Sequence, residues 1–127
     1  SRISLAIQIV AAEHSKIPTL VLDEVDVGIG GATAEIIGRL LKKLGSISQV
    51  ITITHLPQVA SHANNHYLAK KQQLHSEKIS TTLTLLNDED RVEEISRMLG
   101  GINITDKTRG HAHEMLALAQ EIKPELL

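Results

Sequence analysis

The chain has 127 residues, which suits one domain or a piece of one, and 42% of them are hydrophobic. A formal net charge of −2 excludes a basic nucleic-acid footprint on this part alone, although another part of a longer chain can still contact DNA. The absence of cysteine excludes disulfides, thiolate metal sites and a cysteine nucleophile, and no apolar run approaches the roughly 20 residues that span a bilayer.

The first half of the chain alternates helix-like and strand-like patterns. Apolar residues recur at helical spacing over residues 2–15 and 32–44, and a shorter helix is expected around 57–63. On the second helix one apolar face is predicted, made of Ile36, Ile37, Leu40, Leu41 and Leu44. Gly45 is placed to cap this helix.

Two short apolar runs predict strands that are buried on both faces, Thr19–Leu22 and Gln49–Thr54. A helix separates them, and a strand–helix–strand crossover is right-handed and brings its strands together in parallel. Asp23 and Glu24 follow the first strand and His55 follows the second. Because ligands bind at the carboxyl edge of open α/β sheets, these three residues mark a candidate site.

The second half of the chain predicts a hairpin and two helices. The strands are expected over Tyr67–Gln73 and Lys78–Leu86, and the second of them alternates apolar and hydroxyl side chains. Helices are expected over Asp88–Leu99 and Lys107–Ile122. The first should have Asp88 or Asp90 near its N-terminal cap and should end at Gly100-Gly101. Its inward residues are expected to be Val92, Ile95, Met98 and Leu99.

The short apolar run that ends in Asp23-Glu24 has the pattern of a Walker B strand. Two carboxylates at the end of a buried strand are costly unless something compensates their charge, and a divalent cation does so. Asp23 would hold Mg²⁺, directly or through water, and Glu24 could order or deprotonate a water. The alternative from position alone is an acidic strand-to-loop junction in solvent. His55 likewise could contact a γ-phosphate or be an ordinary histidine at the edge of the sheet.

The glycine-rich stretch Gly28-x-Gly30-Gly31 lacks the third glycine of a dinucleotide-binding loop, and three acidic residues just before it would repel a pyrophosphate. A mobile or tightly turned loop is the better interpretation. No G-x-x-x-x-G-K-[ST] sequence occurs, so the phosphate-binding loop and its lysine are missing. His62 and His66 have the spacing of half a zinc site, but no partner pair is evident.

Taken together, several strings resemble the C-terminal part of the ATPase head of the RecN family, bacterial DNA-repair ATPases of the SMC-like, ABC-type class. The resemblance covers the whole chain, from a segment similar to the tail of the signature helix to the C-terminal helices. It is carried by Leu20–Glu24 (Walker B), Asp26–Ala32 (D-loop), Ile53–Ala60 (switch histidine) and Arg97–Gly101. Gly30 departs from the wider ABC pattern, because it stands where the D-loop aspartate is usual.

The resemblance implies an α/β fold: a partial P-loop NTPase head, residues 1–127, with mainly parallel strands flanked by helices. It implies that Asp23 serves Mg²⁺, that Glu24 is the catalytic base, and that His55 contacts the γ-phosphate of ATP. Gly28, Gly30 and Gly31 would allow close backbone approach to a second head.

The resemblance implies four partners: the N-terminal part of the same head, a second copy of the head, DNA, and a recombinase. It implies a location in the bacterial cytoplasm, close to the nucleoid, and no contact with membranes. Because Ser1 stands in place of Met, we expect the interior of a longer protein that hydrolyses ATP, and a fragment that is inactive alone. The alternatives are a non-catalytic module that docks heads, or the ATP-binding subunit of another ABC-type ATPase such as a transporter.

Overall fold

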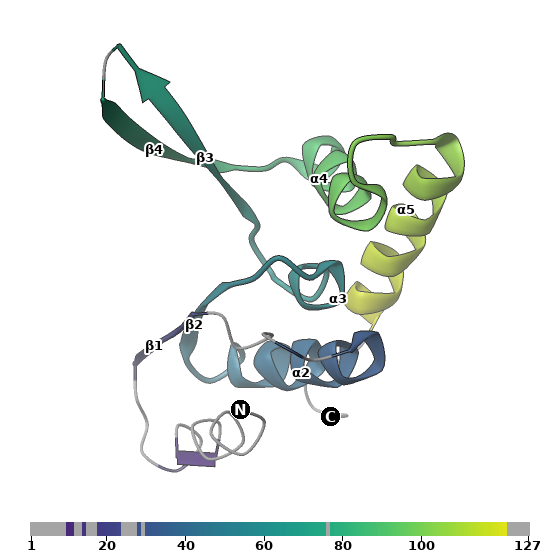
Figure 1. Cartoon of the computed structure of the whole chain (residues 1–127). Coiled ribbons are helices and arrows are strands. Elements are labelled where there is room, and N and C mark those ends of the chain that lie inside the picture. Colours follow the sequence, from purple (N-terminus) through teal and green to yellow (C-terminus); the bar gives the residue numbers. More distant parts are fainter. Residues whose placement is uncertain are drawn as a thin grey trace.

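The computed structural model describes residues 10–11, 14, 18–23, 28, 30–75 and 77–121. Its elements follow the predicted alternation (Figure 1): β1 (Thr19–Asp23), α2 (Gly31–Leu44), β2 (Gln49–Ile53), α3 (Pro57–Ala60), β3 (Tyr67–Leu74), β4 (Lys78–Leu85), α4 (Asp88–Gly100) and α5 (Asp106–Glu121). Of the helix predicted over residues 2–15, Val10, Ala11 and His14 are described and helical, and the rest lies outside the described residues.

The strand–helix–strand unit β1-α2-β2 confirms the expected parallel pairing. The register runs from Thr19 opposite Gln49 to Asp23 opposite Ile53. Both strands therefore point the same way, and their carboxyl ends lie side by side. The chain has a mixed α/β architecture with a parallel strand pair, as the sequence predicted.

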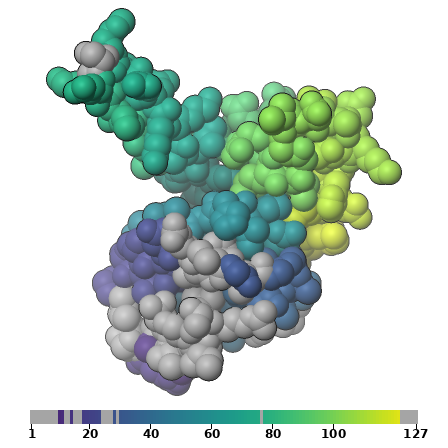
Figure 2. Space-filling view, in the orientation of Figure 1, coloured from purple at the N-terminus to yellow at the C-terminus, as the bar shows by residue number. Residues whose placement is uncertain are grey.

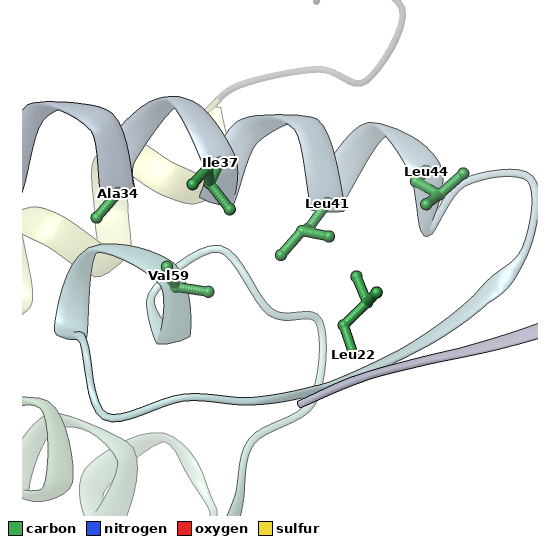
Figure 3. Packing of buried hydrophobic residues seen from close by; sticks show 6 residues of the cluster. All are labelled: Leu22, Ala34, Ile37, Leu41, Leu44 and Val59. Atoms are coloured by element: carbon green, nitrogen blue, oxygen red, sulfur yellow. The ribbon is translucent and has the colours of Figure 1, made fainter. Parts of the chain in front are cut away.

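A small aliphatic core lies between α2 and one face of this strand pair (Figure 3). Leu22 of β1 and Val59 of α3 meet one side of α2 there. The contributing α2 residues recur at intervals of three and four, so they share one helix face: Ala34, Ile37, Leu41 and Leu44. The predicted apolar face is partly wrong, because Ile36 and Leu40 are exposed. They project from the sides of the helix that the sheet does not cover.

The expectation that both strands are buried on both faces is wrong for this chain. Side chains alternate across a strand, so β1 and β2 each present two faces. Leu22 is 3% exposed, whereas Val21 is 61% exposed and Ile53 is 54% exposed. The helix α2 covers the first face, and none of the other described elements covers the second. Both strands carry apolar residues on each face, so the sequence pattern did not reveal that only one face is covered here.

A second cluster joins α3 to the C-terminal helices α4 and α5. Its buried members are Ala60, Val92, Ile95, Ala112 and Leu116. Val92 and Ile95 are buried as predicted, with Met98 and Leu99 packed beside them. The four-residue helix α3 contacts α2 on one side and α4 on the other.

The ends of α4 follow from local hydrogen bonding. Its N-cap is Asn87, whose side-chain oxygen accepts a hydrogen bond of 2.8 Å from the backbone N–H of Asp90. Asp88 and Asp90 lie in the first turn of the helix, close to its cap, as predicted. At the other end Gly101 has φ of 68°, a left-handed conformation that favours glycine, and it ends the helix as predicted.

The strands β3 and β4 form the predicted antiparallel hairpin, which projects away from the rest of the molecule (Figures 1 and 2). Its register pairs Tyr67 with Leu85 and Ala69 with Leu83, so these apolar side chains share one face. Leu83 is 70% exposed. None of the helices that the structure describes has the length and apolar character required to span a bilayer.

Candidate functional site

The described residues bring two of the predicted site residues to one edge of the β1–β2 pair. Asp23 is the last residue of β1 and lies opposite Ile53, the last residue of β2. His55 follows Ile53 by two residues, and both Asp23 and His55 are exposed. The parallel register therefore confirms the expected placement, while the chemical roles of the two side chains stay a prediction.

The chain turns sharply between β2 and α3, and this turn sets the position of His55. The hydroxyl oxygen of Thr54 accepts a hydrogen bond of 3.0 Å from the backbone N–H of Leu56. Leu56 is the N-cap of α3 and Pro57 is its first residue, where the missing N–H of proline costs nothing. His55 is thus held between a strand end and a helix start.

Glu24, the predicted base, lies outside the described residues, and so does Asp26. Of the predicted glycines, Gly28 has φ of +75° and occupies a turn that favours glycine. Gly30 is the N-cap of α2, and its carbonyl oxygen accepts a hydrogen bond of 2.9 Å from Ala34. Gly31 opens the helix beside the side chain of Gln58. The glycine-rich segment therefore leads from the end of β1 into α2.

The side chain of Asp23 at the strand edge is of a type that binds magnesium. Asp23 offers an exposed carboxylate, and Mg²⁺ is usually bound through one or two carboxylates together with phosphate oxygens and waters. In the part of the chain that the structure describes, no group of three or more His, Cys, Asp or Glu residues is placed to hold a metal. His62 and His66 accordingly form no zinc site there.

One buried pair was not predicted from the sequence. His62 is 4% exposed, and its Nε2 lies 2.9 Å from Oε1 of Glu35. A carboxylate only accepts hydrogen bonds, so the imidazole nitrogen donates. This bond links α2 to the end of α3 across 27 residues of sequence. The sequence around His62 gave no indication of this hydrogen bond.

A second unpredicted contact holds α3 from the side of α4. The buried guanidinium of Arg91 donates hydrogen bonds of 2.5 to 3.3 Å to three carbonyl oxygens at the end of α3, those of Ala60, Ser61 and Ala63. Burial lowers the pKa of Arg91, and the nearby Asp88 acts in the opposite direction. Burial, reinforced by the charge of Arg91, also lowers the pKa of His66, and Glu94 opposes that shift.

The fold is shared with a solved structure of the SMC ATPase class. That structure comes from work on ATP-driven dimerization and DNA-stimulated activation of SMC ATPases, and it superposes with a TM-score of 0.61. The match covers 79% of this chain and 59% of the other, at 16% sequence identity. At that identity the likeness concerns the fold alone.

The sequence comparisons show similarity to DNA repair proteins named RecN. The chain is 46% identical over 119 residues to the DNA repair protein RecN of Vibrio cholerae, a match that covers 94% of the chain. It is 40% identical over 124 residues to RecN of Halalkalibacterium halodurans. No model of a protein family matches. The chain spans about a fifth of the length of these relatives, 21% and 22%, and the similarity to them extends over nearly all of its own length.

Proposed function

We propose that the chain is the C-terminal half of the ATP-hydrolysing head of a RecN-like protein, a head with the P-loop NTPase fold of the ABC type. The observation that carries the proposal is the position of Asp23 at the carboxyl end of β1 and of His55 two residues beyond the carboxyl end of the adjacent parallel strand β2. Ligands of open α/β sheets bind at such an edge. The similarity to RecN proteins over nearly the whole chain supports the same function.

Each residue at this edge has a distinct role in the proposal. Asp23 holds Mg²⁺, directly or through water, and the ion neutralises phosphate charge when Mg·ATP is bound. Glu24 orients the attacking water and accepts its proton. The imidazole of His55 donates a hydrogen bond to the γ-phosphate. The turn that carries Gly28, Gly30 and Gly31 supplies backbone for close approach to a second head.

The site is completed by residues outside this chain. The sequence holds no G-x-x-x-x-G-K-[ST] loop to bind the phosphates, so the N-terminal part of the same head must supply it. The exposed apolar face of β1 and β2, with Val21, Ile51 and Ile53, supports this arrangement, because contiguous apolar surface of this kind marks an interface. We therefore expect the 127-residue chain alone to hydrolyse no ATP.

The wider role follows from the relatives and is proposed for the full-length protein. It hydrolyses ATP between two copies of the head and acts in DNA double-strand break repair and recombination. Its partners are DNA and a recombinase, and its place is the bacterial cytoplasm, near the nucleoid. The relatives named above are bacterial DNA repair proteins, and the fold is that of an SMC ATPase structure.

The competing proposal is a module that docks heads without catalysis, and Asp23→Ala in the full-length protein separates the two. Loss of the metal ligand should abolish Mg²⁺-dependent ATP hydrolysis, measured by phosphate release during a titration with Mg·ATP. The matched control is Asp106→Ala, which removes an exposed carboxylate at the start of α5. Wild-type turnover in Asp23→Ala would favour the docking module, and the control should keep full activity.

A further inference from the structure

The helices α2 and α3 approach each other more closely than side chains normally allow. A Cβ atom added at Gly38 would lie 2.5 Å from Cδ2 of His62 and 2.7 Å from the carbonyl oxygen of Gln58. Only glycine permits this approach, because the second of these atoms belongs to the backbone. Gly38 is fully inside α2, so the contact is made at the middle of the helix.

A polar bond fixes the same contact one helical turn earlier along α2. Glu35 receives the hydrogen bond of 2.9 Å from His62, whose side chain is almost fully buried. The first turn of α2 adds a third contact, because the side chain of Gln58 lies beside Gly31. We refer to the Glu35–His62 bond and the Gly38 contact together as the α2–α3 clasp.

The clasp joins the two segments that carry the candidate site. Gly30 and Gly31 begin α2, and His55 precedes α3 by two residues. A helix of four residues has no stiffness of its own, because isolated short helices are marginal in water. The position of α3, and of the turn that leads into it, is therefore set by the side chains that hold it from α2 and α4.

We propose that Glu35 and His62 are positioning residues for ATP hydrolysis, holding the His55 turn in a fixed position relative to Gly30 and Gly31 at the start of α2. The inference rests on the proposed function, since His55 has a position to keep only if it meets a phosphate. It goes beyond a stability role, because a bond that merely stabilised the fold would not act through His55. A displacement of about 1 Å at a reacting group lowers turnover roughly a hundredfold, so even a small shift of the turn is measurable.

The test uses the full-length protein, with ATP turnover expressed per nucleotide-binding site so that misfolded molecules do not count. Glu35→Ala should lower kcat about tenfold or more while KM stays within about twofold, because the shift misplaces His55 without removing a group that grips ATP. Glu35→Gln should restore kcat, because an amide oxygen still accepts the hydrogen bond from His62. Arg39→Ala is the matched control: it removes the exposed partner of Glu35 at 3.3 Å and leaves His62 in place, so kcat should not change.

A double variant shows whether the effect passes through His55. Residues that act as a unit are not additive, so Glu35→Ala should add no further loss in the His55→Ala background. Unchanged kcat in Glu35→Ala, or a fully additive loss in the double variant, would overturn the inference and leave the proposed function intact. If instead the wild type hydrolyses no ATP, or His55→Ala turns over normally, the proposed function fails and the inference falls with it.

Discussion

The substitution Gly38→Ala should destabilise the chain even though it places a better helix former inside α2. The added Cβ would lie 2.5 Å from the His62 ring and 2.7 Å from a backbone oxygen that cannot swing aside. Overpacking costs about 1–3 kcal/mol, and we expect the upper part of that range, about 2–3 kcal/mol, because one clash is with the backbone. The higher helix propensity of alanine stabilises the helix by about 1 kcal/mol, so the free energy of unfolding should fall by about 1–2 kcal/mol in total.

The same substitution at Gly110 is the matched control. Gly110 lies inside α5, and a Cβ added there meets no heavy atom within 4 Å. Only the gain in helix propensity remains, so Gly110→Ala should raise the free energy of unfolding by about 0.5–1 kcal/mol. Urea unfolding of the purified chain, followed by circular dichroism, measures both. If Gly38→Ala stabilises the chain as Gly110→Ala does, the close approach of α2 and α3 is refuted.

Two further predictions concern the side chains around the end of α3. Arg91→Met should lower the free energy of unfolding by about 1–3 kcal/mol, because the carbonyl oxygens at the end of α3 lose the hydrogen bonds that the buried guanidinium donates. Arg109→Ala, which breaks an exposed ion pair, should leave the urea midpoint unchanged, and equal effects of the two substitutions would contradict this prediction. The lowered pKa of His66 means that the unfolded chain takes up a proton first, so stability should fall as the pH drops below about 6.5. Thermal unfolding of wild type and His66→Gln at pH 7.5 and 5.0 measures this, and the two should lose stability equally if His66 has no part in it.

Local sequence patterns sufficed for the elements and for the edge where Asp23 and His55 meet. The spacing of apolar residues predicted α2 within one residue, because a helix packed on a sheet needs a stripe at intervals of three and four. Parallel pairing followed from the crossover rule, and the register then placed the two strand ends together. These inferences need only the patterns within short segments and the order of those segments along the chain.

The remaining features depend on contacts that sequence spacing does not encode. The Glu35–His62 bond joins residues 27 apart, and Arg91 reaches carbonyl oxygens 28 to 31 residues away. The exposed face of β1 and β2 was misjudged for another reason. An apolar run indicates that a strand can be covered on both faces, but not which residues provide the cover, and this chain matches only about a fifth of its relatives.

The most direct test of the account is ATP turnover by the full-length protein that carries Glu24→Gln. Glutamine keeps the size of the side chain but cannot accept the proton of the attacking water, so hydrolysis should slow by roughly two to four orders of magnitude. Binding of Mg·ATP should persist, because the groups that grip the phosphates are unchanged. Tight binding with almost no phosphate release is the predicted result, and turnover at the wild-type rate would contradict the assignment of this chain as the hydrolytic half of the head.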